Sequence, residues 1–413
     1  MIPSVAELVA RADELRPRLV ELQAETEERT YYSLEIHGAF LEAGFYDVLV
    51  PKRYGGLELD LGSFWRVVIA VARGCPSTAW CLCLPAGHAL QTGMLFEEDV
   101  QAELFGGGLF LCPAVAAPAG SAKRVEGGWE LTSTHAYSSG APYATHYMGQ
   151  TFAAPEEDGG PPGRLLLFIA PRESWTMLDD WGDTLGLRGS GSHSVRFEQA
   201  FIPERFVLED TWMVDTNVAG GTPGARIHGN SMYAGRTLAY FEGSLAAIMI
   251  GAAKGALDEY EEILRTRKTQ RPPIVTRIED PDYQRWYGLA TGKVAAAEAA
   301  LLHVAEQWHE ACRRSVEDGI PFTREEDLRL NMIAREALTL AWEAMQGEIF
   351  RTAGSSAARR GQRIERIFRD MSIGWGHFGT IVRDWTAREW TREHFGLVDE
   401  VLRPDRLHQT ERR

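Results

Sequence analysis

The sequence has no long hydrophobic run. No apolar stretch in the 413 residues approaches the roughly 20 residues that a helix needs to cross a bilayer. Residues 1–19 also lack a basic stretch followed by an apolar core, and their apolar residues recur at helical spacing instead. These absences argue against a membrane protein and a secretory signal peptide, so we expect a cytoplasmic protein without a membrane partner.

Cysteine is scarce and its spacing is irregular. The five cysteines are Cys75, Cys81, Cys83, Cys112 and Cys312, an odd number that forms no disulfide framework. The Cys81–Cys83 pair has one residue between its members rather than two, and no second pair follows, which argues against a zinc site. We expect buried free thiols in a reducing compartment and no metal centre.

Positive charge is in the minority. The chain has 43 Lys and Arg against 58 Asp and Glu, a net charge of −15. An acidic protein repels phosphate backbones, so nucleic acid is not expected as a partner. The 45% hydrophobic and 24% charged residues are typical of a globular enzyme. A chain of this length commonly folds into about two or three domains.

The pattern of hydrophobic residues changes twice along the chain. Helical spacing dominates residues 1–110, with helices expected at 34–43, 62–74 and 77–94. Short apolar runs bounded by Gly and Pro follow in residues 111–210, with a solvated hairpin loop at 156–163. The runs that predict strands are 109–111, 128–132, 147–152 and 165–169.

Helical patterns return in residues 211–413. A Gly-rich linker at 211–230 precedes four long helical patterns, at 236–267, 281–316, 323–350 and 363–395. Four such helices in succession predict a bundle. The sequence therefore predicts an α+β fold with three domains: an N-terminal helical domain (1–110), a middle β domain (111–210) and a C-terminal four-helix bundle (211–413).

This order resembles the acyl-CoA dehydrogenase superfamily over nearly the whole chain. Residues 127–132 and 135–140 are similar to a superfamily segment that presents a hydroxyl to the N5 edge of a flavin. Ser139 falls at that hydroxyl position and Tyr137 at an aromatic one. A serine hydroxyl can donate or accept a hydrogen bond, which suits either role at N5. The alternative for Ser139 is a simple turn at the end of a strand.

A second segment resembles one branch of the superfamily more closely. Residues 181–195 are similar to the W-x-x-L-G-x-R-G-T-G-S-H-D-V stretch of the group D two-component flavin monooxygenases. Its glycines let backbone approach a ligand closely, and no βαβ pattern surrounds them as a dinucleotide fingerprint requires. The resemblance implies that Gly191 and Ser192 bind the cofactor. A tight turn between strands is the alternative for each residue alone.

Two further segments lie in the predicted bundle. Arg267 follows Gly251 by 16 residues, the spacing at which the dehydrogenases place an arginine near the flavin phosphates, although Lys268 and Thr269 replace the usual Phe-Gly. A solvated cation at a helix end is the alternative for Arg267. Residues 352–357 and 363–370 resemble the group D loop that touches the flavin of a neighbouring subunit. That loop implies cofactor binding by Gly354, Ser355 and Ser356, and a homotetramer built as a dimer of dimers.

The segment after Asp370 separates two chemistries. Many acyl-CoA dehydrogenases have Y-E-G-T there, and its Glu removes the substrate's α-proton; here Phe378 stands at that position. A phenyl ring cannot accept a proton. Some family members carry the base on an earlier helix, where Glu242 lies. His377 matches the R-D-x(6)-H spacing of the group D monooxygenases, so the resemblance implies a catalytic histidine. Its alternative is a structural histidine in the core or at an interface.

Four residues are predicted to contact substrate. The resemblance implies that His88, on the helix expected at 77–94, touches a phenolic substrate and acts in catalysis; a core histidine is its alternative. Trp80, Tyr143 and Trp375 are expected as neighbours of the same pocket, which should lie where the three domains meet. Ser139 is expected to act in catalysis through the flavin.

The predicted activity follows from this resemblance. Reduced FMN or FADH2, supplied by a separate NAD(P)H:flavin reductase, would react with O2 to form a C4a-peroxyflavin that hydroxylates a small aromatic substrate. The chain carries no nicotinamide fingerprint, so the reductase is expected to be another protein. The alternatives are a nitrososynthase-like N-oxygenase, an S-oxygenase of the same branch, and an acyl-CoA dehydrogenase. A non-catalytic scaffold is disfavoured by Ser139, Arg267 and His377 together.

Overall fold

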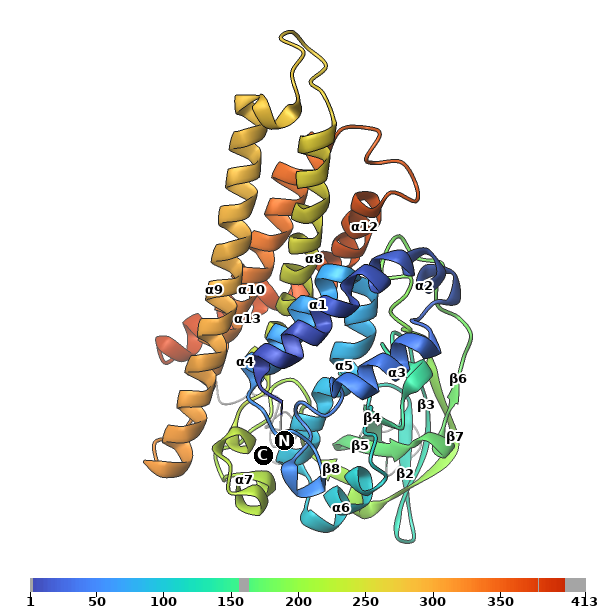
Figure 1. Ribbon diagram of the computed structural model, residues 1–413. Helices are drawn as coiled ribbons and strands as arrows, with labels where there is room; N and C mark the ends of the chain where they lie inside the picture. Colours follow the sequence, from blue (N-terminus) through green and yellow to red (C-terminus); the bar gives the residue numbers. More distant parts are fainter. Residues whose placement is uncertain (1–2, 156–162, 378, 398–413) are drawn as a thin grey trace.

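The computed structural model describes residues 3–155, 163–377 and 379–397, and three regions follow one another along the chain (Figure 1). The first region is helical. Its helices are α1 (Val5–Glu21), α2 (Gln23–Arg29), α3 (Leu34–Ala43), α4 (Leu61–Gly74), α5 (Pro76–Leu95) and α6 (Glu98–Gly106). Local sequence sets several of these boundaries. Ser4 and Glu7 form a capping box at the start of α1, and Pro76 occupies the first turn of α5, where its missing N–H is not needed.

The second region is one eight-stranded sheet. Its strands are β1 (Ala114–Val115), β2 (Ser121–Val125), β3 (Gly128–His135), β4 (His146–Ala153), β5 (Leu165–Pro171), β6 (Thr176–Met177), β7 (Val195–Pro203) and β8 (Val207–Glu209). The main path runs β6-β7-β3-β2-β4-β5-β8, and β1 pairs with β4. The β2–β4 and β1–β4 pairs are parallel and the others antiparallel. The hairpin turn between β2 and β3 contains Gly127 at φ 76°.

The third region is again helical. Its elements are α7 (Pro223–His228), α8 (Leu238–Thr266), α9 (Pro281–Glu317), α10 (Arg324–Glu343), a π-helix (Ala344–Phe350), α11 (Arg351–Ala353), α12 (Arg363–Gly376) and α13 (Gly379–His394). Short 3₁₀ turns occur in all three regions of the described chain. They are η1 (Lys52–Tyr54), η2 (Ala141–Tyr143), η3 (Arg172–Ser174), η4 (Glu204–Phe206), η5 (Ser231–Ala234) and η6 (Arg277–Glu279). The predicted fold class, with a sheet between two helical regions, is confirmed.

Local predictions differ from the structure in four places. Residues 109–111 form no strand, because the Leu111 N–H donates to the Thr145 hydroxyl rather than to a strand backbone. The linker contains the short helix α7, capped by the Thr222 side chain. The helix expected at 323–350 continues as a π-helix after Glu343. The last predicted helix is divided between α12 and α13. The loop predicted at 156–163 lies, apart from Gly163, outside the described residues.

Helix α5 is the element around which the regions meet. It is buried on nearly every side, and it packs against α4, α8 and α12 (Figure 1). Such an all-round apolar helix is typical of the interior of a large protein. One continuous apolar core extends from the N-terminal helices through the sheet to the bundle. All five cysteines are buried free thiols in this core. Within the described part of the chain, no helix is long and apolar enough to cross a membrane.

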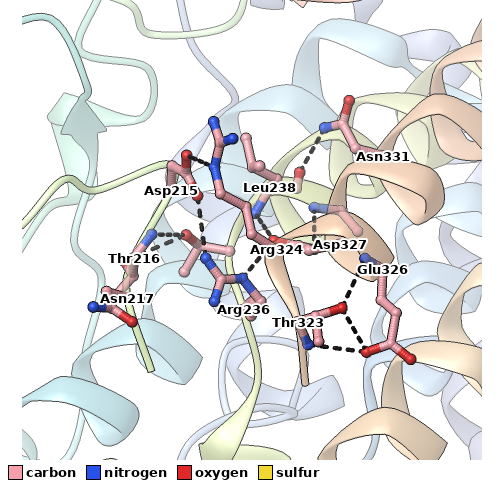
Figure 2. Close-up of polar contacts among 12 residues, drawn as sticks. Asp215, Thr216, Asn217, Arg236, Leu238, Thr323, Arg324, Glu326, Asp327 and Asn331 are labelled. Atoms are coloured by element: carbon pink, nitrogen blue, oxygen red, sulfur yellow. Dashed lines mark hydrogen bonds and ion pairs between the residues drawn. The ribbon is translucent and has the colours of Figure 1, made fainter. Parts of the chain in front are cut away.

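A buried charge network fixes the linker to the bundle (Figure 2). Asp215 pairs with Arg324 at 2.7 Å and with Arg236 at 3.3 Å, and Arg236 faces Asp327 at 3.8 Å. The Asp327 carboxylate accepts the first two backbone N–H groups of α8, beginning with Leu238 at 3.1 Å. Those N–H groups have no partner within the helix, so Asp327 caps α8 from another helix. Burial raises the pKa of Asp327 to about 6.

Candidate active site

The loop after β3 is seated directly on α5. Gly140 has a φ of 83°, and a Cβ there would lie 2.2 Å from the Pro85 side chain and 2.8 Å from the Cys81 carbonyl oxygen. Only glycine fits both the backbone conformation and the space. The Gly140 N–H also donates to the Ser190 and Gly191 carbonyls at 3.1 Å, which ties this loop to the second glycine-rich loop. The two loops therefore approach α5 together.

Ser139 ends a short chain of buried hydroxyl groups, referred to below as the serine chain (Ser139, Ser192, Ser190). The Trp80 indole N–H of α5 donates to Ser139 Oγ at 2.9 Å. Ser139 Oγ lies 2.8 Å from Ser192 Oγ, which lies 2.6 Å from Ser190 Oγ. Ser190 is fully buried, whereas Ser139 keeps 7% of its surface exposed. The chain thus runs from Ser190 in the protein interior to Ser139, the member with the largest exposed fraction.

Asp370 joins the same loops to α12. Its carboxylate accepts the Leu187 N–H at 2.7 Å and the Ser77 hydroxyl at 2.9 Å. Gly186 permits this approach, because a Cβ there would lie 2.1 Å from the Arg369 carbonyl oxygen. Burial raises the pKa of Asp370 to about 6, against the lowering effect of the Leu187 hydrogen bond. One carboxylate therefore connects α12, α5 and the second glycine-rich loop.

His377 directly follows the last residue of α12, and its ring packs against the ring of Trp80. The two ring centroids are 5.3 Å apart in an edge-to-face arrangement. The His377 side chain is exposed, yet the protein around it withdraws it from bulk water and lowers its pKa to about 4, with the Arg335 guanidinium as the second cause. The imidazole is neutral near pH 7 and keeps a lone pair that can accept a proton.

His88 lies on α5, eight residues after Trp80. Its Nδ1 is 2.7 Å from the Cys112 carbonyl oxygen. Because a carbonyl only accepts, Nδ1 carries the hydrogen, and Nε2 is left as the basic nitrogen. Burial lowers the pKa of His88 to about 4. Phe241 of α8 packs beside the ring, with centroids 5.6 Å apart. His88 is therefore buried and neutral, with one nitrogen committed to the backbone.

Trp375 and Tyr143 occupy different surroundings. The Arg335 guanidinium lies 4.9 Å above the Trp375 ring, and Trp342 is stacked on that ring at 6.3 Å. Trp375 is thus close in sequence to His377 and packed toward the bundle. Tyr143 turns toward the N-terminal helices, where it stacks on His37 at 4.2 Å and its hydroxyl donates to a backbone carbonyl. This position gives its predicted contact with substrate no support.

The residues predicted to bind the cofactor fall into two groups. Tyr137, Ser139, Gly191 and Ser192 lie together on the two loops of the β domain. Tyr137 is 69% exposed at a φ of 63°, and its ring meets the Trp181 ring at 5.7 Å. The exposed Tyr137 ring and the half-buried Trp181 ring form an aromatic pair between the two loops, and such a pair near hydroxyl groups fits a planar heteroaromatic ring with polar edges, as a flavin has.

The second group lies near the end of the bundle that is farther from the sheet (Figure 1). The Arg267 guanidinium donates to the Ser356 hydroxyl at 2.5 Å. Gly354 has a φ of 92° and adjoins Arg277, whose guanidinium donates to the Ala353 carbonyl at 2.8 Å. Ser355 stands between these residues in the same loop. Among the described residues, no hydrogen bond or ion pair joins this group to the serine chain.

Glu242, the alternative dehydrogenase base, is part of an ion pair. Its carboxylate accepts the Arg335 guanidinium at 3.1 Å, and both side chains are almost fully buried. Burial raises the pKa of Glu242, and Arg335 opposes that shift. The carboxylate is thus engaged inside the bundle. Phe378, the residue on which the sequence argument depended, lies outside the described residues.

Sequence reasoning missed the residues that connect the site. Asp370 served there only as a marker of spacing, and Ser190 only as one letter of a motif. Arg335 and Ser77 were not noticed. A buried carboxylate has no sequence signal of its own, but Asp370 lies seven residues before His377 in a motif, and that position could have drawn attention to it.

Two family models match the chain. One, described as "Acyl-CoA dehydrogenase, N-terminal domain", matches residues 6–96. The other, described as "Acyl-CoA dehydrogenase, C-terminal domain", matches residues 244–381. Together they span more than half of the chain, and they fall on the first and the third region of the fold, which are helical.

Curated relatives match most of the chain. A "Pigment production hydroxylase" from a Rhodococcus species is 29% identical over 89% of this chain and 91% of its own length. The "Flavin-dependent monooxygenase, oxygenase subunit HsaA" of Rhodococcus jostii is 27% identical over 89% of this chain and 93% of its own. The oxygenase component of p-hydroxyphenylacetate 3-hydroxylase from Acinetobacter baumannii is 27% identical, with 86% and 81% covered.

Solved structures agree in fold. The crystal structure of 3-HSA hydroxylase from Rhodococcus sp. RHA1 superposes with a TM-score of 0.84 at 25% identity, over 95% of this chain and 98% of that one. XiaF from a Streptomyces species, in complex with FADH2 and glycerol, gives a TM-score of 0.86 at 23% identity, with 97% of each chain covered. The chain belongs to the acyl-CoA dehydrogenase family, and the curated relatives that it resembles over most of its length include flavin-dependent monooxygenases. Two of these relatives are named as an oxygenase subunit and an oxygenase component, and the XiaF structure contains FADH2.

Proposed function

We propose that this chain hydroxylates a small phenolic substrate, using O2 and a reduced flavin that a separate NAD(P)H-dependent reductase delivers. The observation that carries the proposal is the position of Trp80. Its N–H holds Ser139, and its ring packs against His377. One side chain thus connects the hydroxyl predicted to face the flavin with the imidazole predicted to act in catalysis. The names of the relatives, which include hydroxylases of phenols, support the same substrate class.

The residues suit defined roles in this reaction. A bound reduced flavin supplies the electrons that activate O2. Tyr137, Ser139, Gly191 and Ser192 would hold the ring system. The neutral imidazole of His377 can accept the proton of a phenol, which makes the aromatic ring more nucleophilic. His88 presents Nε2 as a second hydrogen-bond acceptor, so it can orient the phenol. Trp375 packs beside His377 and supports the position of the α12 end.

The second group of cofactor residues would act across a subunit boundary. Arg267, Gly354, Ser355 and Ser356 form one cluster near the end of the bundle that is farther from the sheet, so a flavin at Ser139 would meet such a cluster on a neighbouring copy. We therefore propose a homotetramer, arranged as a dimer of dimers, in the cytoplasm. Sedimentation equilibrium would give a mass near four times the 46.0 kDa of the chain. A monomer that retains full flavin affinity would contradict this arrangement.

The structure favours this proposal over acyl-CoA dehydrogenation. The dehydrogenase reaction needs a free carboxylate that can reach the substrate's α-proton. Glu242 is held by Arg335 in a buried ion pair instead. His377 and His88 are neutral groups suited to a phenol. N- and S-oxygenation use the same flavin chemistry, and the substrate panel below separates them from hydroxylation.

The proposal is tested with the purified chain, a flavin reductase, NAD(P)H, and either FMN or FAD. A panel of phenols, arylamines and thioethers is incubated under ¹⁸O2, and products are identified by mass spectrometry. We expect one ¹⁸O atom in a hydroxylated phenol, formed only when the reductase is present. Catalase is added to this reaction to remove free H2O2. A parallel reaction without catalase, in which H2O2 replaces the reductase, should give no product. A tightly bound FAD that an acyl-CoA bleaches without oxygen would overturn the proposal in favour of the dehydrogenase.

A further inference from the structure

A buried ion pair joins α8 to α10 next to the last turn of α12. Arg335 of α10 donates to the Glu242 carboxylate of α8 at 3.1 Å, and their side chains are 1% and 4% exposed. Both groups have lost their hydration, and their mutual attraction only partly offsets that loss. Well-packed apolar side chains of similar volume are often at least as stable as such a pair. The stability of the fold therefore does not explain why charges stand at this position.

The arginine of this pair lies against the last turn of α12. Its guanidinium is 4.9 Å from the centre of the Trp375 ring, and Trp375 precedes His377 by two residues. The same turn is packed closely on α8 and α5, because a Cβ on Gly374 would lie 2.7 Å from Met249 Sδ and 3.7 Å from the Trp80 ring. One tightly packed turn thus carries both the ring that the guanidinium covers and the candidate catalytic imidazole.

The other charged groups around His377 that the structure describes are engaged elsewhere. From α5 comes the uncharged Trp80 ring, and the Asp370 carboxylate of α12 accepts hydrogen bonds from α5 and the second glycine-rich loop. The described ion pairs of α13 are made with α10. Burial and, after it, the Arg335 guanidinium lower the pKa of His377 to about 4. Both the contacts and this effect indicate that Arg335 gives the surroundings of the imidazole a positive potential.

We propose that Arg335 is a positioning residue that favours the phenolate form of the substrate beside His377, and that Glu242 limits this effect. The inference rests on the proposed function, because it requires a phenol at this site. In the step concerned, the phenol O–H bond breaks, its electron pair stays on the oxygen, and the proton passes to the imidazole and on to water. A positive potential favours phenolate and neutral imidazole over their protonated forms. Glu242 carries the opposite charge and weakens that potential.

The ionisation of a bound probe phenol tests the inference directly. The purified protein is loaded anaerobically with reduced FMN or FADH2 and binds 2,6-difluorophenol, which is not turned over because O2 is absent. The ¹⁹F resonance of this probe moves when its hydroxyl ionises, so a pH titration gives the midpoint at which half of the bound probe is phenolate. Displacement by the phenol that is hydroxylated under ¹⁸O2 shows that the probe occupies the substrate site. Failure of the wild type to bind any phenol would overturn the proposed function.

Two variants change the potential in opposite directions. Glu242→Gln keeps a hydrogen-bond acceptor for Arg335 and removes the negative charge, so the midpoint should fall by about half a pH unit or more. Glu242→Gln combined with Arg335→Met removes both charges, and the midpoint should rise above the wild-type value by a similar amount. A neutral pair of similar volume should preserve the fold, which thermal unfolding checks. An unchanged or lower midpoint in the folded double variant would overturn the inference while leaving the proposed function intact.

Arg335→Lys separates the charge of this residue from its packing. Lysine keeps the positive charge but lacks the planar guanidinium that lies over Trp375. The midpoint should stay near the wild-type value, because the charge carries the effect. A purely structural role of Arg335 predicts instead that the lysine variant and the double variant change alike. A midpoint in Arg335→Lys equal to that of the neutral double variant would therefore contradict the proposal.

The Arg73–Asp258 pair provides the matched control. It joins α4 to the same helix α8 through a hydrogen-bonded contact of 2.7 Å, and it makes no described contact with the last turn of α12. Arg73→Met combined with Asp258→Asn should leave the midpoint at the wild-type value. A shift as large as that of the Glu242 and Arg335 double variant would show that any ion pair on α8 has this effect, and would contradict the assignment to Arg335.

Discussion

Two buried polar regions of this molecule differ in the kind of polar group that forms them. The linker network shown in Figure 2 consists of full charges, with Arg236 and Arg324 set against Asp215 and Asp327. The candidate active site consists mainly of hydroxyls, an indole and imidazoles that are neutral at pH 7, together with the Asp370 carboxylate. Both regions are largely closed to water. They differ in the charge of their groups: the linker network is made of ion pairs, and the candidate site is made mainly of neutral groups.

Several groups of the charged network form hydrogen bonds with backbone atoms. Asp327 accepts two N–H groups at the start of α8, and the Asn331 amide donates to the Leu238 carbonyl in the same turn. The serine chain and the histidines are neutral groups instead, and the hydrogen bond of His88 is made by Nδ1, which leaves Nε2 unused among the described residues. Paired charges hold a fold in one arrangement, whereas neutral groups with an unused hydrogen-bonding position can bind and transfer protons. The two regions should therefore respond differently to mutation.

The largest effect should follow from His377→Ala. It removes the proton acceptor at the end of α12, and we expect hydroxylation to fall by about 10²- to 10⁴-fold, the usual contribution of a general base. Flavin affinity and the free energy of unfolding should change little. Steady-state product formation and flavin titration measure the two properties. His303→Ala, an exposed histidine on α9, is the control. Unchanged turnover in His377→Ala would remove the main catalytic assignment.

Asp327→Ala should have the reverse profile. It leaves Arg236 without this partner and leaves two N–H groups of α8 uncapped, and breaking a buried pair costs about 3–5 kcal/mol of unfolding free energy. Chemical denaturation measures the loss. Asp258→Ala breaks the half-exposed Arg73–Asp258 pair and should cost about 1 kcal/mol or less. Equal losses in the two variants would show that the buried network is no more important than a surface pair.

The smallest effect should be a change in how stability depends on pH. The folded-state pKa of Asp327 is raised to about 6 from 3.8, so its contribution to stability falls as pH rises from about 4 to 6. The folded-state pKa of His88 is lowered to about 4 from 6.5, so its contribution rises over nearly the same range. Denaturation at pH 4, 5 and 6 measures the sum. Asp327→Asn should make stability rise more steeply with pH, and His88→Asn less steeply. Identical slopes in both variants would contradict these assignments.

The sequence predicted the architecture because the architecture is periodic. Hydrophobic spacing identified the helix at 34–43 with the bounds that the structure has, and it separated the sheet from both helical regions. It failed at 109–111, where an apolar run is buried without pairing as a strand, and at 363–395, where the helix is interrupted. Periodicity reports burial, and burial alone does not specify the partner of each N–H group.

The sequence predicted individual candidate residues of the site, but it did not predict the contacts between them. Motif spacing identified Ser139 and His377 as functional candidates, and both contact Trp80. Nothing in the sequence shows that the Trp80 N–H points at Ser139, or that Asp370 reaches Leu187. Such contacts depend on rotamers and on the packing of distant segments. Arg267 and Ser356 were predicted for one role, and their direct contact across 89 residues is a product of the fold.

The hydrogen bonds that Asp370 accepts from Ser77 and Leu187 have a consequence for how the protein folds. They reach Ser77 across 293 residues and Leu187 across 183. Contacts this distant in sequence close late, because the loop between them must be ordered first. During synthesis, the N-terminal helices and the sheet are complete long before residue 370 of 413 has been made. The site therefore assembles among the last parts of the protein, and a nascent or truncated chain that ends before α12 would have most of the fold without the means to complete its active site.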